Sequence, residues 1–484
     1  MPGRHSAIAV LTVATLGAAL AVAPAAVAAS TCRDLFRRSA VAPAGGAWSG
    51  AIAVGRFDAD RRDDVALAGG LRIRVLLGER GGGLRLAAPD ISRPTTASVL
   101  AGELTGDGRT DLVEAAYDGR VAVLAGDGRG RFTPATELRF AYPRLHALAD
   151  LNSDGRADLV LTTRDSTLAS HLRVLLGDGR GGFAESAVVS LTADAAVGVR
   201  DLNGDARPDV LTGAELGARK PQVHFGDGAG GLGPPVEAAD WTGRVSAIAF
   251  ADFDGDDRDD VAMAGAGVVT VLLGDGRGRF RARRSIPGGS FVGRRDGIAA
   301  GDFDRDDRED VAFFSGGDSG DIGVLLGNGA GRFRAAPGSP EYGGIYPPTP
   351  GAVGDIDGDG RLDLIGVRGG GRPEVRILRN TGGRAPRGRR AQTILPGRPR
   401  PPEQLAGSRV DFEARLRCHP GRISLYRRPL RRPPSGSWRR IGGDETDYRG
   451  VVALTDTPRV SSEYQWRARG AAPSRRMIVR VRRG

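Results

Sequence analysis

The acidic sequence DFDGDDRDD at residues 252–260 is the most informative part of this chain. Oxygen-bearing side chains stand at its first, third, fifth and ninth positions: Asp252, Asp254, Asp256 and Asp260. A hard divalent cation such as Ca²⁺ prefers six to eight oxygen ligands. Carboxylates at alternate positions of a tight loop can converge on one such ion, and the backbone carbonyl of Arg258 can add a ligand. Because the four carboxylates would otherwise repel one another, the stretch predicts a cation site.

This acidic loop recurs seven times at nearly regular spacing. Its copies begin at Arg56, Glu103, Asp150, Asp201, Asp252, Asp302 and Asp355. A second signature follows most copies, for example VLLGDGRGRF at 271–280 and VLLGDGRGGF at 174–183. A period of about 50 residues with four short strands predicts one propeller blade per copy. In the fifth copy we expect strands near 245–251, 261–265, 268–273 and 279–286. A calcium-binding nonapeptide β-helix would repeat far faster and is excluded.

The acidic loop and the Gly-x-Gly-x-Phe turn together resemble the FG-GAP or VCBS-type repeat of bacterial secreted proteins. They are also similar to the calcium-binding blades of the integrin α-subunit propeller, over roughly residues 36–380. The resemblance implies an all-β chain with a seven-bladed β-propeller that binds Ca²⁺. In the integrin relatives, the ligand binds on the face opposite the cation loops. Because one fold hosts many functions, the resemblance does not identify the ligand.

Five copies of the loop are predicted to bind Ca²⁺, since three have four carboxylates and two replace one carboxylate with an amide oxygen. Besides 252–260, the four-carboxylate copies are Asp302, Asp304, Asp306, Asp310 and Asp355, Asp357, Asp359, Asp363. The amide-containing copies are Asp150, Asn152, Asp154, Asp158 and Asp201, Asn203, Asp205, Asp209.

Two copies are predicted to be poorer cation sites. One contains Glu103, Thr105, Asp107 and Asp111, and it is weaker because threonine offers one neutral oxygen and glutamate has a longer arm. The first copy begins with Arg56. This guanidinium could replace the cation by pairing with the carboxylates that follow it, which are Asp58, Asp60 and Asp64. We therefore expect a weak or empty site there.

Position six of the loop favours a left-handed backbone. Glycine occupies it at Gly108, Gly155 and Gly360. Asp257 and Asp307 can adopt this conformation, whereas Arg61 and Ala206 do so less readily.

The first 28 residues have the three parts of a secretory signal peptide. Arg4 supplies a positive charge, Ala7 to Val22 is apolar and uncharged, and Ala26-Val27-Ala28 is an A-x-A cleavage site. A membrane anchor is the weaker alternative, because small residues dominate the apolar part and no second apolar segment of spanning length follows. We expect an exported chain, secreted or at the cell surface, cleaved near Ala28 and without a transmembrane segment.

The remaining chain is predicted to contain three parts. The propeller spans 29–383, a Pro- and Arg-rich linker spans 384–402, and six or seven strands in 403–484 predict a small immunoglobulin- or fibronectin-like β-sandwich. Residues 36–41 resemble residues 183–188, where the outermost strand of a blade is expected. We expect this segment to pair with Val375–Arg379 in the seventh blade, which would close the ring with strands from both chain ends.

Charge and cysteines limit the choice of partner and compartment. Residues 384–484 contain 25 Arg against 8 Asp and Glu, whereas the whole chain has a net charge of +11. This basic part could favour an acidic polymer such as an anionic glycan or nucleic acid, but a solvated Arg-rich surface is the preferred interpretation, and we predict no nucleic-acid binding. Cys32 and Cys418 could form an interdomain disulfide, or both could be free or intermolecular thiols.

Motifs for catalysis do not emerge from the sequence. It contains no G-x-S-x-G, H-E-x-x-H or P-loop motif and no Cys-His cluster, and its histidines after His5 of the leader are expected in different blades or domains, which suggests no triad. We predict a non-enzymatic module that binds an extracellular glycan or protein, as in adhesion. The alternative is a secreted polysaccharide lyase or hydrolase with acid and base groups at the central channel. Tyr342, Tyr346, Trp241 and Phe291 could line a ligand surface, but packing between blades is the preferred interpretation.

Overall fold

The structure, a computed structural model, describes most of residues 35–382 and the strands that follow. The described ranges are 35–43, 51–69, 71–215, 219–265, 268–287, 297–314, 321–336, 341–342, 351–368, 374–382, 393–396, 403–405, 410–417, 422–429, 439–445, 451–456, 462–468 and 477–482. Every regular element in these ranges is a β-strand. The predicted signal peptide lies outside the described residues, as do Cys32, Cys418, Phe291 and Tyr346.

Seven antiparallel sheets follow one another along the chain, and we number them as blades 1 to 7. Blade 1 contains β2 (Ala51–Gly55), β3 (Asp64–Gly69), β4 (Arg72–Glu79) and β5 (Gly83–Leu86), with β6 (Ile91–Ser92) also paired to β4. Blade 2 contains β7 (Thr96–Gly102), β8 (Asp111–Ala116), β9 (Arg120–Gly126) and β10 (Phe132–Arg139). Blade 3 contains β11 (Arg144–Ala149), β12 (Asp158–Arg164), β13 (Ser170–Gly177) and β14 (Phe183–Leu191).

The remaining blades follow the same order of strands. Blade 4 contains β15 (Ala195–Arg200), β16 (Asp209–Ala214), β17 (Gln222–His224) and β18 (Val236–Glu237). Blade 5 contains β19 (Ala247–Ala251), β20 (Asp260–Gly265), β21 (Val268–Gly274) and β22 (Phe280–Pro287), close to the predicted strands. Blade 6 contains β23 (Gly297–Gly301), β24 (Asp310–Phe314), β25 (Asp321–Gly327) and β26 (Phe333–Ala335), with β27 (Glu341–Tyr342) also paired to β25. Blade 7 contains β28 (Ala352–Gly354), β29 (Asp363–Arg368), β30 (Glu374–Asn380) and β1 (Phe36–Pro43).

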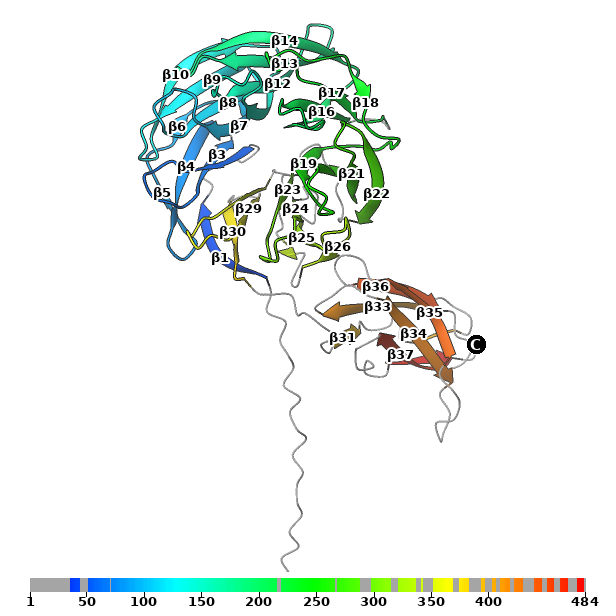
Figure 1. The fold of residues 1–484 in the computed structure, drawn as a ribbon. Coiled ribbons are helices and arrows are strands. Elements are labelled where there is room, and N and C mark those ends of the chain that lie inside the picture. Colours follow the sequence, from blue (N-terminus) through cyan, green and yellow to red (C-terminus); the bar gives the residue numbers. More distant parts are fainter. Residues whose placement is uncertain are drawn as a thin grey trace, which may run out of the picture. The chain divides into compact units, whose positions relative to one another are not determined.

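The first strands of the blades form a closed ring (Figure 1). Strands β2, β7, β11, β15, β19, β23 and β28 contact one another in this order, and β28 contacts β2 again. The predicted seven-bladed β-propeller is therefore confirmed.

Strand β1 closes the ring, as predicted. It runs antiparallel to β30, with Phe36 opposite Asn380 and Ala42 opposite Val375. The carbonyl of Leu35 also accepts a hydrogen bond from the backbone of Thr381 at 2.8 Å. Because blade 7 combines strands from both ends of the propeller segment, opening the ring requires breaking a sheet.

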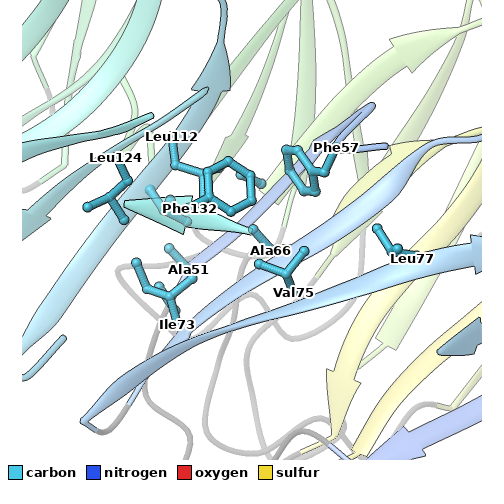
Figure 2. Close-up of a cluster of buried hydrophobic side chains, with 12 residues drawn as sticks. Ala51, Phe57, Ala66, Ile73, Val75, Leu77, Leu112, Leu124 and Phe132 are labelled. Atoms are coloured by element: carbon cyan, nitrogen blue, oxygen red, sulfur yellow. The ribbon is translucent and has the colours of Figure 1, made fainter. Parts of the chain in front are cut away.

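Apolar side chains fill the space between neighbouring blades (Figure 2). Phe57 of blade 1 packs edge-to-face on Phe132 of blade 2, with ring centroids 5.3 Å apart, beside Leu112 and Leu124. Phe253 and Phe333 repeat this contact between blades 5 and 6. The phenylalanine of the Gly-x-Gly-x-Phe signature thus packs on the second residue of the acidic loop in the preceding blade. Trp241 packs partly buried against the core of blades 4 and 5, as the preferred interpretation expected.

Two further sheets follow the propeller. One contains β31 (Thr393–Pro396), β33 (Val410–Arg417) and β36 (Val451–Asp456). The other contains β32 (Glu403–Leu405), β38 (Met477–Arg482), β37 (Ser462–Ala468), β34 (Arg422–Pro429) and β35 (Arg439–Glu445). The ring of Phe412 in the first sheet lies 4.3 Å from that of Tyr464 in the second, and both side chains are buried. An immunoglobulin- or fibronectin-like sandwich stays a prediction for this region, as do the domain boundaries.

Candidate metal centres

Each acidic loop connects the first and second strands of its blade, so we number the loops as the blades. The carboxylate at position nine begins the second strand and is fully buried in every loop. In loop 5, Asp260 Oδ2 accepts the N–H of Phe253 at 2.9 Å, and Oδ1 accepts the N–H of Gly274 at 2.8 Å. The same two bonds recur in the other loops, with Asn380 in place of the glycine in blade 7. Position nine therefore ties the loop to the third strand, a role that the sequence analysis did not assign.

Burial raises the pKa of several position-nine carboxyl groups. The pKa of Asp310 rises to about 8, and the pKa values of Asp260 and Asp363 rise to about 7. Desolvation is the largest cause, and the neighbouring carboxylates of the same loop add to it, although the two backbone N–H groups act in the opposite direction. A divalent cation in the loop would supply the positive charge that the buried carboxylates need.

The carboxylate at position one organises the backbone of six loops. In loop 5, Asp252 accepts hydrogen bonds from the backbone N–H groups of Gly255, Asp256 and Asp257 at 2.7–3.1 Å. In these six loops, positions four and six both have positive φ angles: Gly106, Ser153, Gly204, Gly255, Arg305, Gly358 and Gly108, Gly155, Ala206, Asp257, Asp307, Gly360. The left-handed conformation predicted at position six is thus confirmed in these loops, and it includes Ala206 despite its Cβ atom.

Loop 1 has a different conformation, because Arg56 cannot accept these bonds. Neither Ala59 nor Arg61 has a positive φ angle. The predicted pairing of Arg56 with Asp58, Asp60 and Asp64 is wrong, because Arg56 Nε lies 3.6 Å from Asp63 Oδ1 instead. The other oxygen of Asp63 accepts a hydrogen bond from the N–H of Asp355 at 2.8 Å. Arg56 therefore contacts a carboxylate at the junction of blades 1 and 7.

Loops 5, 6 and 7 bring three carboxylates together. In each group, one oxygen per residue lies within 4.8 Å of the others: Asp252, Asp254, Asp260; Asp302, Asp304, Asp306; and Asp355, Asp357, Asp359. In the described loops 2 to 4 no such trio occurs, and position three is Thr105, Asn152 or Asn203. The amides of Asn152 and Asn203 donate to the carboxylates at position five at 3.1 Å.

Unpartnered oxygens show that the loops suit a cation. Asp304 is only 7% exposed, and its Oδ1 atom has no hydrogen-bond partner. Oδ1 of Asp254 and Oδ1 of Asp306 are also buried without a partner. Buried polar atoms are normally satisfied, so a group that coordinates oxygen fits here. Carboxylate, amide and carbonyl oxygens form the hard donor set that suits Ca²⁺ or Mg²⁺.

Arginine at position seven was missed by the sequence analysis, although it occurs in all seven copies. In six loops its guanidinium pairs with the carboxylate at position five, as Arg109 does with Asp107 at 3.3 Å. Its side chain also packs against the first glycine of the turn between strands three and four, as Arg109 does on Gly128. The sequence shows that arginine recurs at position seven, but only the fold shows that it pairs with the carboxylate at position five.

The acidic loops and the Gly-x-Gly-x-Phe turns meet at one end of the propeller. The N–H of Gly130 in blade 2 donates to the carbonyl of Phe57 in loop 1 at 2.7 Å, and Gly278 donates to Leu202 of loop 4 at 2.8 Å. In blade 7 the side chain of Asn380 donates to the carbonyl of Phe303 at 2.7 Å. Each of these turns therefore contacts its own loop and the loop of the preceding blade. We call this arrangement of loops and turns the loop belt.

Comparison with protein families agrees with this architecture. The FG-GAP-like repeat family matches residues 103–161, 150–212, 201–263 and 252–313. Each match begins at position one of an acidic loop and extends beyond the following loop. The chain is thus a seven-bladed β-propeller whose residues 103–313 are FG-GAP-like repeats, which confirms the resemblance predicted from the sequence. A search among curated proteins found no match.

Solved structures show only a weak similarity to this chain at low sequence identity. A lectin of Agrocybe aegerita that recognises non-reducing terminal N-acetylglucosamine is 19% identical, covers 62% of this chain and 79% of its own, and has a TM-score of 0.45. BBS1N, solved in complex with ARL6DN, is 12% identical over 72% of this chain and 98% of its own, with a TM-score of 0.47. A variant of AofleA from Arthrobotrys oligospora is 12% identical over 62% and 90%, with a TM-score of 0.39. At these values the similarities support no conclusion about this chain.

Proposed function

We propose that this chain is an exported, Ca²⁺-stabilised β-propeller that binds a protein ligand with the end opposite the loop belt. The observation that carries this proposal is a group of exposed apolar side chains at that end. They are Leu71, Tyr117, Tyr142 and Leu168, which are 65%, 52%, 58% and 62% exposed, and we call them the apolar arc. Export rests on the predicted signal peptide.

The topology places the apolar arc at the end opposite the loop belt. Leu71, Tyr117 and Leu168 lie between the second and third strands of blades 1, 2 and 3, and Tyr142 lies between blades 2 and 3. In an antiparallel four-stranded sheet, these connections lie opposite those between strands one and two and strands three and four. A contiguous apolar surface on a monomeric protein usually marks an interaction site.

Backbone hydrogen bonds hold the apolar arc in place. The carbonyl of Leu71 accepts the N–H of Arg93, and the N–H of Tyr117 donates to the carbonyl of Thr95, both at 2.9 Å. Thr95, Tyr142 and Leu168 also have φ angles of 64°, 49° and 65°. A side chain with a Cβ atom costs roughly 1–2 kcal/mol in this conformation, and such strain gathers at functional sites.

A buried carboxylate lies in blade 2, on the strand that precedes Tyr117 of the apolar arc. Glu114 is fully buried and accepts hydrogen bonds from Arg93 Nε, Thr96 Oγ1 and Arg120 Nε. These bonds fix the segment that precedes β7, where Thr95 meets Tyr117. Tyrosine side chains such as Tyr117 and Tyr142 are enriched at the centre of protein–protein interfaces.

The loops would hold the ion through residues of this chain. In loop 5 the ligands would include Asp252, Asp254 and Asp260, and loops 6 and 7 would use the carboxylates at positions one, three and five. The bound ion would neutralise buried negative charge between blades. Its role in this proposal is structural.

A glycan ligand is the second candidate, because a hollow of about 330 Å³ opens at the same end of blade 4. Its lining includes Thr192, Gln222, Thr242 and Arg219, side chains that can hydrogen-bond to a sugar. No observation of the described residues favours the polysaccharide-cleaving alternative.

The test compares binding by the purified mature protein and two variants, in Ca²⁺ and in EGTA. The probes are solubilised cell-surface proteins and a panel of polysaccharides. Tyr117→Ser combined with Tyr142→Ser should abolish protein binding, whereas Val188→Ser, at an exposed position on β14, should not. Protein binding that survives the double substitution would contradict the proposal. Glycan binding alone would favour the second candidate, and polysaccharide turnover would favour an enzyme.

A further inference from the structure

Position three of the acidic loop varies together with one position in the fourth strand of the same blade. This strand-four position directly follows the residue that ends the Gly-x-Gly-x-Phe turn, or its equivalent in blade 7. Where position three is Asp, the strand-four position is Arg: Asp58 with Arg85, Asp254 with Arg281, Asp304 with Arg334, and Asp357 with Arg37. Where position three is neutral, the strand-four position is neutral too: Thr105 with Thr133, Asn152 with Ala184, and Asn203 with Gly233. None of the seven blades departs from this rule.

Strand register places these residues equivalently. Arg85 lies opposite Leu77, Arg281 opposite Leu273, and Arg334 opposite Leu326. Each of these leucines directly precedes a glycine of the third strand: Gly78, Gly274 or Gly327. In blade 7 the fourth strand is β1, and Arg37 lies opposite Arg379. The rule therefore holds even where the fourth strand comes from the other end of the propeller segment.

Ion pairs connect the two positions in space. Arg85 Nη2 lies 3.4 Å from Asp58 Oδ2, and Arg334 Nη2 lies 3.7 Å from Asp304 Oδ2. The structure shows no such pair for Arg281. Asp304 has one oxygen beside the guanidinium, while its Oδ1 atom stays buried and unpartnered.

In blade 7 the ion pair comes from the third strand. Arg379 pairs with Asp357, and its Nη2 atom lies 3.4 Å from Asp359 Oδ2.

Counting charges shows what the rule achieves. Loops 2 to 4 have three carboxylates at positions one, three, five and nine, and no strand-four arginine. Loops 5 to 7 have four carboxylates and one strand-four arginine. The position-seven arginine is common to all loops. At positions one, three, five, seven and nine together with the strand-four position, six loops thus have the same net charge, although two different sets of residues produce it. Outside these positions, loops 5 and 6 also have acidic residues at positions six and eight, and blade 7 has Arg379.

We propose that the strand-four arginines, with Arg379 acting in blade 7, compensate the charge of the position-three aspartates. This inference rests on the proposed Ca²⁺ binding. The guanidinium offsets repulsion among the four carboxylates when no ion is bound, and it opposes the approach of a divalent cation. The four-carboxylate loops therefore bind the ion no more tightly than the three-carboxylate loops, and they keep their conformation without it.

The first test removes Arg334 and measures thermal unfolding in EGTA and in millimolar Ca²⁺, together with Ca²⁺ affinity by calorimetry. Arg334→Ala should lower Tm in EGTA, leave Tm in saturating Ca²⁺ nearly unchanged, and tighten one Ca²⁺ site by about tenfold, the scale of one Coulomb interaction at a partly exposed site. Arg332→Ala changes a neighbouring arginine of the same turn and should alter neither quantity. Weaker Ca²⁺ binding, or an unchanged Tm in EGTA, would overturn the proposal.

The second test moves the rule between blades. Asp304→Asn combined with Arg334→Ala gives position three and the strand-four position of blade 6 the neutral pair found in blades 2 to 4, so in EGTA the double variant should be more stable than Arg334→Ala alone. Asn152→Asp should lower Tm in EGTA, and added Ala184→Arg should restore it. Additive effects in both pairs would contradict charge compensation. If the wild-type protein bound no Ca²⁺, the proposed function would fail, whereas the coupling in EGTA would still be measured.

Discussion

The two ends of the propeller are built by opposite rules. At the loop belt, the blades repeat the same contacts. The position-nine carboxylate accepts two backbone hydrogen bonds, the position-seven arginine pairs with position five, and a turn contacts the preceding loop. At the other end, polar networks differ between blades. Glu114 joins Arg93 and Arg120 in blade 2, whereas Asp194 accepts from Arg164 and Ser170 beside blade 3. A feature made in every blade stabilises the blade, whereas a feature made once is available for recognising a specific partner.

Removing the ion should have the largest effect, because it changes the repeated end in several blades at once. When the free Ca²⁺ concentration is about ten times the Kd, each bound ion adds about 1.4 kcal/mol to the free energy of unfolding. The sites together therefore add several times that amount. EGTA should therefore lower Tm strongly, and Ca²⁺ should restore it, as measured by circular dichroism. A Tm that EGTA does not change would place stability elsewhere in the blades.

Glu114→Ala changes only the other end. It leaves Arg93 and Arg120 without their buried carboxylate, which should lower the free energy of unfolding by about 4 kcal/mol. Urea unfolding in saturating Ca²⁺ measures this loss. The control, Glu137→Ala, removes an exposed pair with Arg139 and should cost about 0.5 kcal/mol or less. A similar loss in both variants would mean that the buried Glu114 network stabilises the fold no more than an exposed ion pair does.

The pH dependence should distinguish the loop belt with and without ion. Folding raises the pKa of Asp310 to about 8 and those of Asp260 and Asp363 to about 7, so without metal the folded state binds more protons than the unfolded state between pH 6.5 and 8. Stability in EGTA should therefore rise as the pH falls from 8 to 6.5. In Ca²⁺ the trend should flatten or reverse, because the ion stabilises the charged carboxylates.

Two histidines set the lowest pH at which this experiment can be interpreted. Burial lowers the pKa values of His146 and His224, so both groups destabilise the folded state on acidification, but only below about pH 6.5. Tm measured at intervals from pH 8 to 6.5 in both buffers tests the prediction. Parallel curves would show that the ion does not interact with the position-nine carboxylates.

Ala206→Gly should have the smallest effect. Ala206 holds a φ angle of 65° at position six of loop 4, where glycine removes the steric strain. The free energy of unfolding should increase by about 0.5–1 kcal/mol in urea. Ala229→Gly, at a position in the same blade without a positive φ angle, should instead be neutral or destabilising. Equal effects would remove the strain argument.

Much of the loop belt could be predicted from the sequence because its residues lie close together in each repeat. The nine-residue spacing revealed the carboxylates, and the resemblance of residues 36–41 to 183–188 revealed the closing strand. The partner of Arg56 could not be predicted, since Asp63 is held by the backbone of Asp355 in another blade. The apolar arc was also missed, because Leu71, Tyr117 and Leu168 have ordinary neighbours in the sequence.

The sequence alone determined the number of blades, since every acidic loop requires one four-stranded sheet and the copies number seven. Only the tertiary structure decided which oxygens lack a partner and which apolar side chains face solvent. Both depend on contacts between blades, such as Phe57 with Phe132 or Asn380 with Phe303, whose residues are far apart along the chain. Periodicity specifies what each blade is made of, but the exposure of a side chain depends on its neighbours in space.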